Sequence, residues 1–213
     1  MLESVAHFGT GLGLAAGAGL NAYAVLLVYG GIAHLFPADF PGAIAKFLAD
    51  PLTLAVLLGL YLLEFFADKI PGLDHVWDIV HTVVRPAAGA LLAVAAVAPG
   101  ADTPMTILAG GGGGVTALAA HLVKGTARLT STALTAGVAN FALSLAEDIL
   151  AILQAIVSIF LPLVALVLVV AVTGLFLVCV PKLARGVNIF ANRRRRSRAA
   201  APVPSKPPAP AGR

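Results

Sequence analysis

The chain has 213 residues, of which 59% are hydrophobic and only 11% are charged. A soluble domain is about 45–50% apolar and about 25% charged, so this composition excludes a disordered chain and argues against a water-soluble globule. The chain's one cysteine, Cys179, excludes an intrachain disulfide and a zinc site made of several cysteines.

Six apolar segments come close to the roughly 20 residues that a helix needs to cross a membrane. In chain order they are residues 9–35, 51–68, 83–99, 105–124, 131–156 and 161–181. Glu3 stands where a secretory signal would carry a basic residue, so we expect the first segment to be retained. The last two segments meet at Pro162, and one kinked helix over 149–182 is the alternative to two helices there.

The basic residues of the loops predict the orientation, because lysine and arginine are enriched on the cytoplasmic side of membrane proteins. With six spans and a cytoplasmic N-terminus, the cytoplasmic side receives Lys69, Arg85, Lys124, Arg128, Lys182 and Arg185. The opposite loops carry Asp39, Lys46, Asp50 and Asp102 and are net acidic. The sequence therefore predicts an all-α, polytopic transmembrane helical bundle of about six spans with both termini cytoplasmic, in the cell membrane of a bacterium (the inner membrane).

The net charge of +4 is concentrated at the C-terminus. Residues 193–213 hold seven of the 14 basic residues and none of the ten acidic ones, which leaves a net charge of −3 for residues 1–192. Because this end is also rich in alanine and proline, we expect a transmembrane domain over 1–190 and a disordered basic tail over 191–213. The expected partners are the lipid bilayer and anionic lipid head groups at the tail, with self-association left open. Nucleic acid is not expected, since no aromatic residues interleave the basic block.

Ionisable side chains inside apolar segments are costly, so each needs a partner or a role. Four runs recur at the spacings of three and four residues that share one helical face. They are Glu64 and Asp68 followed by Lys69; Asp74, Asp78, His81 and Arg85; His121, Lys124 and Arg128; and Asn140, Ser144 and Asp148 beside Glu147. Pro86 disfavours the helical conformation of the residue before it, so we expect the second run to break at Arg85.

Three of these acids lie among apolar neighbours rather than near the end of a segment, namely Glu64, Glu147 and Asp148. We expect them to pair with lysine or arginine from another helix, or to line a wet cavity. A purely structural ion pair is the main alternative. For the other charges, the alternatives are side chains that reach interfacial water and residues that only fix the topology.

Glycine marks two places of close packing or irregular backbone. Gly9, Gly13, Gly17 and Asn21 recur every four residues, which predicts a ridge of small residues against another helix. Gly110, Gly111, Gly112, Gly113 and Gly114 form an uninterrupted run. This run is either a packing groove or an unwound segment of the kind that lines transporter sites. It is not a phosphate loop, because no G-K-[ST] follows it.

The sequence holds no H-E-x-x-H, G-x-S-x-G or C-x-x-C motif, so it predicts no cofactor and does not favour an enzyme. Asp78 and His81 have an acidic-x-x-His spacing that some helical metal sites use, and His75 or His121 would complete such a site. A metal-dependent membrane enzyme is kept as a lesser alternative on that ground.

The order of these elements resembles a family of membrane proteins catalogued as domain of unknown function 4126. The elements are Gly19-Leu20-Asn21-Ala22-Tyr23; Glu64 with Asp68-Lys69-Ile70-Pro71 and Asp74; Arg85-Pro86 with Gly89; His121-x-x-Lys124-x-x-x-Arg128; and Ser144-x-x-Glu147-Asp148. The resemblance covers about residues 9–165. The family has proline where this chain has Phe141, so the kink that proline would give is not expected here. The resemblance implies a polytopic helical protein and favours a functional role for the polar residues, without an established activity.

The leading hypothesis is a transporter or channel-like protein for a small solute or ion that uses buried carboxylates. The alternatives are a membrane enzyme acting on a lipid or isoprenoid at the cytoplasmic interface and a non-catalytic scaffold. Geometry separates them. A transporter needs the polar runs to meet near mid-membrane, whereas an enzyme needs them at one interface. A scaffold leaves the glycine ridges on the outer surface and the charges paired.

Overall fold

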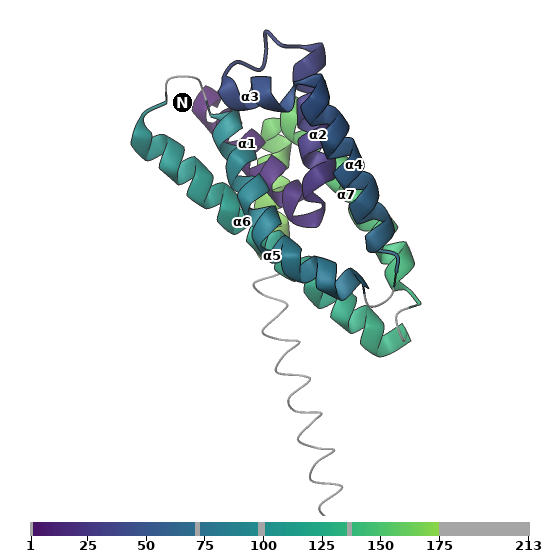
Figure 1. Ribbon diagram of the computed structural model, residues 1–213. Coiled ribbons are helices and arrows are strands. Elements are labelled where there is room, and N and C mark those ends of the chain that lie inside the picture. Colours follow the sequence, from purple (N-terminus) through teal and green to yellow (C-terminus); the bar gives the residue numbers. More distant parts are fainter. Residues whose placement is uncertain (1, 71–72, 98–100, 136–137, 175–213) are drawn as a thin grey trace, which may run out of the picture. The chain divides into compact units, whose positions relative to one another are not determined.

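The computed structural model describes residues 2–70, 73–97, 101–135 and 138–174, and over these ranges the chain is helical with short turns and no strand (Figure 1). The side chains of residues 2, 73–75, 133 and 134 are not described. The helices are α1 (Leu2–Leu20), α2 (Ala22–Leu35), α3 (Ala43–Leu48), α4 (Pro51–Ala67), α5 (Leu73–Ala96), α6 (Thr103–Thr135) and α7 (Asn140–Phe160), and a further helix covers Pro162–Gly174. The predicted tail, 191–213, lies outside the described residues.

The first predicted segment, 9–35, is wrong as a single helix, because the chain reverses at Asn21. This residue leaves the helical conformation, and its side chain accepts a hydrogen bond from the backbone N–H of Ala24, which caps α2. Near the other ends of the two helices, His7 Nδ1 lies 2.9 Å from the carbonyl of Ala96, and Tyr29 donates to the adjacent carbonyl of Ala95 at 3.4 Å. In one straight helix residues 7 and 29 would be about 33 Å apart. Thus α1 and α2 form a hairpin with Asn21 at its tip.

The helices that follow pack along this hairpin in alternating directions. α5 is antiparallel to α1, since the backbone of Gly11 lies against Ala93 and His7 reaches Ala96. α6 packs most extensively on α5, as Figure 1 shows, and α7 runs back along α1 with Ala151 against Gly17. The bundle therefore has two ends, one at Asn21 and one at His7 and Ala96.

Small residues are what allow these helices to approach, as the ridge predicts. A side chain on Gly13 would collide with Ser158 and Ala165, and one on Gly9 would collide with the carbonyl of Pro162. Gly19 lies equally close to Ala117 of α6. The small residues of the ridge pack against other helices of the same chain and do not face the outer surface.

The glycine run lies in unbroken α-helix, so the alternative of an unwound segment is wrong. In an apolar environment the backbone must satisfy its hydrogen bonds internally, which favours helix even where glycine lowers its propensity. Gly113 packs closely on Ala93 and on the carbonyl of Gly89. At Gly111, in contrast, an added Cβ would meet no atom within 4 Å. The run thus provides a packing groove on one side of α6.

The predicted break at Arg85 is also wrong, because α5 continues through Pro86 to Ala96. Membrane helices tolerate proline when neighbouring helices hold the structure around it. Here the Arg85 side chain is fully buried and held by three partners, and Gly89 packs on α6 one turn later. Tertiary contacts therefore override the local preference.

The other predicted segments differ from the observed helices at their boundaries. The predicted 83–99 corresponds to α5, which begins ten residues earlier, and the predicted 105–124 to α6, which extends to Thr135. Hydroxyls of α6 bond to carbonyls four residues back, as Thr126 does to Leu122, so this polar stretch stays helical. The predicted 131–156 is wrong at its start, because α7 begins at Asn140.

Leu161 separates α7 from the helix Pro162–Gly174, which decides against one helix over 149–182. Its backbone, at φ −133° and ψ 59°, is not helical. The part of the predicted sixth segment beyond Gly174 lies outside the described residues.

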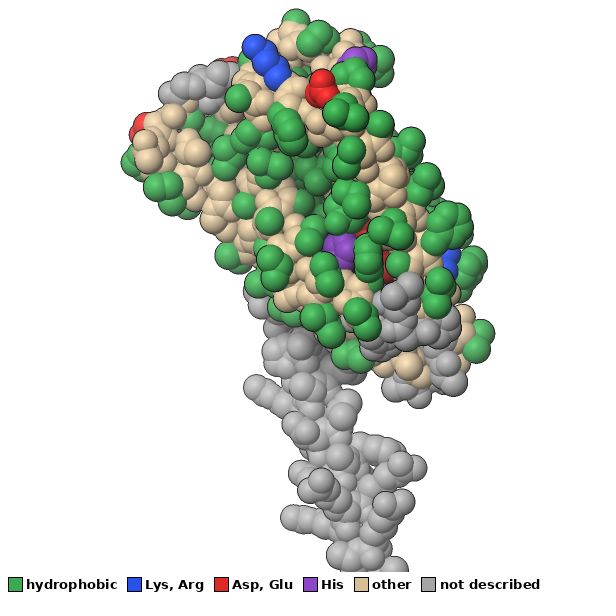
Figure 2. Space-filling view, in the orientation of Figure 1, with side chains coloured by type: hydrophobic (Ala, Val, Ile, Leu, Met, Phe, Trp, Pro, Cys, Tyr) green, Lys and Arg blue, Asp and Glu red, His purple; other side chains and the backbone are tan. Residues whose placement is uncertain are grey.

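Three helical stretches are long and apolar enough to span a membrane, namely Val76–Ala96, Thr103–Thr132 and Asn140–Phe160. Shorter apolar helices cover Ala22–Leu35, Pro51–Ala67 and Pro162–Gly174. In Figure 2 the viewed face is mostly hydrophobic, with charged and histidine side chains confined to a few places. A surface of this kind indicates a membrane protein.

Candidate functional site

Polar side chains from α4 and the turn after it, from α5, α6 and α7, and from the hairpin tip meet inside the bundle in one connected set, which we call the polar network. Most of the predicted polar site residues belong to it. Its members are Asn21, Glu64, Asp68, Lys69, Asp78, His81, Arg85, His121, Lys124, Arg128, Ser144, Glu147 and Asp148.

Arg85 is the centre of the half of the network between α4, α5 and α6. Its guanidinium donates to Glu64 Oε1 at 2.8 Å and to His121 Nδ1 at 2.6 Å, and Asp78 Oδ1 lies 3.6 Å away. Both Arg85 and Glu64 are 0% exposed. Because a buried charge is costly without a partner, this pair fixes α4 against α5.

His81 lies one turn before Arg85 on α5 and faces the same carboxylate, that of Glu64. Its Nδ1 lies 2.9 Å from the carbonyl of Trp77, which requires Nδ1 to carry a hydrogen. The other ring nitrogen, Nε2, lies 3.6 Å from Glu64 Oε1. In the neutral ring this places a nitrogen lone pair towards a carboxylate, whereas a proton on Nε2 makes the contact attractive.

A second half of the network joins α4, α6 and α7. Arg128 donates to Asp68 Oδ2 and to Glu147 Oε2, each at 2.8 Å. Lys124 Nζ lies 3.2 Å from Asp68 Oδ2 and 3.3 Å from Glu147 Oε2. Two cations therefore share two carboxylates, which is the compact pairing that a low-dielectric interior demands.

The hairpin tip enters the network through Asn21 and the residue before it. Asn21 Nδ2 donates to Asp148 Oδ1 at 2.9 Å, and the carbonyl of Leu20 accepts from Lys124 at 3.0 Å. On the far side of Asp148, Lys69 Nζ lies 3.6 Å from Oδ2 and also donates to Ser144 Oγ at 3.5 Å. The turn between α1 and α2 is thus held by side chains of α6 and α7.

The network carries unequal numbers of acids and bases. Its carboxylates are Glu64, Asp68, Asp78, Glu147 and Asp148, and its lysine and arginine side chains are Lys69, Arg85, Lys124 and Arg128. With neutral histidines, the described network therefore has one negative charge in excess. An uncompensated charge is unfavourable in an apolar interior.

Several buried atoms of the network have no hydrogen-bond partner among the described residues, including Glu64 Oε2, Asp68 Oδ1, His81 Nε2 and Arg128 Nη1. Buried polar atoms are nearly always satisfied by protein or by water.

The network lies well inside the bundle along its axis. In the span Val76–Ala96, Arg85 lies about 14 Å from the first residue and about 17 Å from the last, at 1.5 Å per residue. In the span Asn140–Phe160, Glu147 lies about 11 Å from the start. Arg85 is therefore near the middle of Val76–Ala96, whereas its partner Glu64 lies in the last turn of α4, and the rest of the network extends towards the end at which α4 finishes.

Among the predicted site residues whose contacts are described, Asn140 and the glycine run lie outside the network. Asn140 donates to Thr132 at 2.9 Å, at the junction of α6 and α7. Asp74 lies in the first turn of α5, but its side chain, like that of His75, is outside the described set. The glycines from 110 to 114 pack nearer the opposite end of α5.

Two network members, Asn21 and Ser144, are not among the residues predicted for the site. Asn21 interrupts an otherwise apolar stretch, and asparagine there is a signal for an N-cap and hence for a helix start. Ser144 follows Asn140 at helical spacing and shares the face of Asp148. Both signals are present in the sequence, but neither shows which helix lies opposite.

The geometry does not support the metal-site alternative. Asp78 and His121 both contact Arg85, whose positive charge occupies the place between them. Among the described residues, no three histidine, cysteine or acidic side chains are grouped as metal ligands.

Comparison with known proteins gives one result. No curated protein and no solved structure matches the chain. A family model described as "Domain of unknown function (DUF4126)" matches residues 8–182, which confirms the resemblance and extends it at both ends. The chain belongs to this family.

Proposed function

We propose that this protein is a transporter or channel-like protein that moves a small solute or ion across the cell membrane of a bacterium, coupled to a proton or a monovalent cation. The observation that carries the proposal is the excess of carboxylates over lysine and arginine among the described residues of a network that lies largely buried inside the bundle. A site with one charge too many gains or loses a single cation without breaking up its fixed ion pairs.

His81 is the best candidate to carry the proton. Its Nδ1 is committed to the carbonyl of Trp77, so only Nε2 can gain a hydrogen, and this atom faces Glu64. His121 is less suited, because its Nδ1 accepts from Arg85. A protonated His81 would compete with Arg85 for the carboxylate of Glu64. Gain of a proton would therefore change the ion pair that joins α4 to α5.

The hairpin also bears on the membrane topology that we propose. The sequence predicts six spans with both termini cytoplasmic. The reversal at Asn21 supports instead a re-entrant α1–α2 hairpin followed by five crossings, made by α4, α5, α6, α7 and the helix that begins at Pro162. Non-helical backbone at membrane depth is tolerated where protein buries it, and Asn21 is 0% exposed.

The positive-inside rule then orients the molecule. The end at which α4 finishes carries Lys69, whereas the opposite end carries Asp39, Asp50 and Asp102 with one lysine. We therefore place the network end towards the cytoplasm and the N-terminus outside.

A structural ion network in a non-catalytic scaffold is the second candidate, because all four lysine and arginine side chains have a carboxylate within 3.6 Å. The internal use of the glycine ridge speaks against it, since a scaffold would present that ridge to partners. An enzyme at the interface is less favoured, since Arg85 lies about 14 Å or more from either end of Val76–Ala96.

The proposal is tested in reconstituted vesicles with a screen of small ions and solutes under an imposed proton gradient. We expect uptake that the variants Glu64→Gln and Glu147→Gln abolish while both remain folded. The matched control is Asp102→Asn, an exposed helix cap outside the network. Normal uptake by both glutamine variants would remove the coupling role, and no uptake across the screen would remove the transport class.

A further inference from the structure

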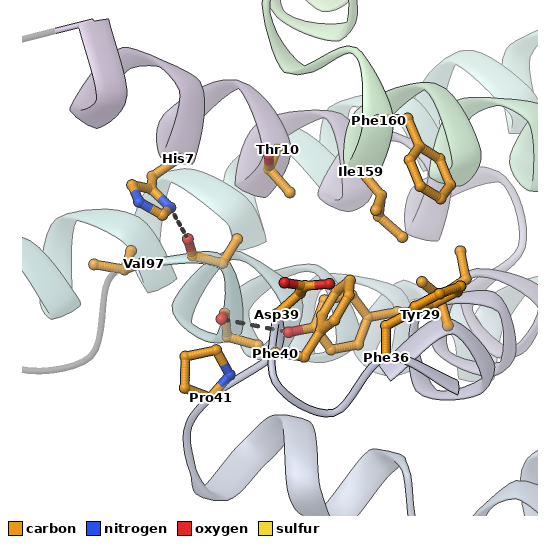
Figure 3. Close-up of a pocket in the computed structure, with 13 residues that line it drawn as sticks. His7, Thr10, Tyr29, Phe36, Asp39, Phe40, Pro41, Val97, Ile159 and Phe160 are labelled. Carbon is orange, nitrogen blue, oxygen red and sulfur yellow. Dashed lines mark hydrogen bonds between the residues drawn. The ribbon is translucent and has the colours of Figure 1, made fainter. Parts of the chain in front are cut away.

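A cavity of about 500 Å³ opens at the end of the bundle opposite the polar network (Figure 3). Its walls come from α1, α2, the segment after α2, and the last residues of α5 and α7. Cavities of about 300–1,000 Å³ are the usual size for small-molecule sites. From Thr10 at the cavity to Asn21 at the network is about 16 Å along α1, and the buried side chains of Leu14, Val25 and Leu92 lie in the core between.

Aromatic side chains form much of the cavity wall. They are Tyr29, Phe36, Phe40 and Phe160. Tyr29 and Phe40 meet edge to face with their ring centroids 5.3 Å apart, which fixes the orientation of both rings. Aromatic faces carry partial negative charge and attract cations, most strongly where water is displaced.

The polar groups of the cavity are also negative in sign. Asp39 contributes the one carboxylate of the described lining, which contains no lysine or arginine, and Figure 3 shows this carboxylate beside the aromatic rings. The carbonyls of Ala95 and Ala96 belong to the last turn of α5, where the helix dipole is negative. Tyr29 and His7 bond to these two carbonyls and so hold the end of α5 at the cavity wall.

We propose that this cavity binds a small organic cation, namely a protonated or quaternary amine that carries an apolar group. The ammonium lies between Asp39 and the faces of the aromatic rings, and the apolar group fills the space towards Ile32 and Ile159. The carboxylate of Asp39, the aromatic faces and the carboxyl end of α5 all disfavour an anion. The inference goes beyond the proposed function and does not rest on it, since binding at this end requires no transport.

The test is isothermal titration of the purified chain, in a neutral detergent, with benzyltrimethylammonium. Benzyl alcohol is the uncharged aromatic comparison. We expect saturable binding of one cation per chain, no saturable binding of benzyl alcohol, and about tenfold weaker binding of the cation by Asp39→Asn. Phe36→Leu removes a half-exposed ring and should weaken binding about threefold.

Asp102→Asn is the matched control, because it removes an exposed carboxylate outside the cavity lining. It should bind the cation as the unchanged chain does. The proposal is overturned if the cation does not bind saturably, if benzyl alcohol binds as tightly, or if Asp39→Asn binds normally. Since Asp39 is exposed, its asparagine variant should keep the thermal stability of the unchanged chain, which separates lost binding from lost folding.

Discussion

The charge balance of the network predicts that replacing Glu64 and replacing Arg85, the two residues of its central ion pair, change the free energy of unfolding by different amounts. Glu64→Gln brings the excess charge of the described network from one negative charge to none. Arg85→Gln doubles the excess and leaves Glu64, which is 0% exposed, with His81 at 3.6 Å as its nearest basic group. Removing one partner of a buried pair costs about 3–5 kcal/mol, and we expect Arg85→Gln to lie in that range.

Glu64→Gln should cost less, about 1–3 kcal/mol, which is the loss of a charged hydrogen bond. Arg85 then retains Asp78 at 3.6 Å and His121 at 2.6 Å. The double variant should be more stable than Arg85→Gln alone, because it leaves no carboxylate unpaired at this position.

The assay is reversible unfolding in mixed micelles, at neutral pH and increasing denaturing detergent, followed by the fluorescence of Trp77. This residue is the chain's only tryptophan, and its ring centroid lies 5.4 Å from that of His81. The reasoning fails if Glu64→Gln is as destabilising as Arg85→Gln, or if the double variant shows the plain sum of the two single effects.

Three further predictions concern packing, the cap and topology. Gly113→Leu should force α5 from α6 and cost at least about 1–3 kcal/mol in the same unfolding assay. Gly111→Leu should be neutral, because a Cβ added at this position meets no atom within 4 Å. Asn21→Ala should lose about 1 kcal/mol of capping energy and more from the network, and an unchanged unfolding midpoint would contradict the hairpin account. In a chain whose native cysteine is replaced by serine, cysteines at Glu3 and Lys46 should react with an impermeant maleimide from the same side of the membrane, whereas six spans require opposite sides.

The polar residues of the site are predictable from the sequence because charge is rare in apolar helices. Glu64, Glu147 and Asp148 stand out by their neighbours alone. Their partners are not predictable in the same way, because Arg128 meets Asp68 across 60 positions of the chain. Helical spacing shows which residues share a face, and only packing shows which faces meet.

The errors in the fold have one common cause, which is that local signals were weaker than tertiary contacts. Pro86 disfavours helix, yet α5 continues because Arg85 is held on the far side of its helix by α4 and α6. In the first segment the apolar pattern extends past Asn21, and mean hydropathy alone does not reveal that the chain turns there. The capping preference of asparagine is the signal that hydropathy misses.

The central claim is that the network exchanges one proton or monovalent cation, and ion flux into reconstituted vesicles tests it most directly. A pH-sensitive dye and dyes for Na⁺ and K⁺ inside the vesicles report flux after a gradient is imposed. The account predicts flux of one of these ions above that of empty vesicles, lost in His81→Phe and Glu64→Gln and retained in Asp102→Asn. Vesicles with the unchanged chain that are no more permeable than empty ones to any of the three ions, with or without added solutes, would contradict it.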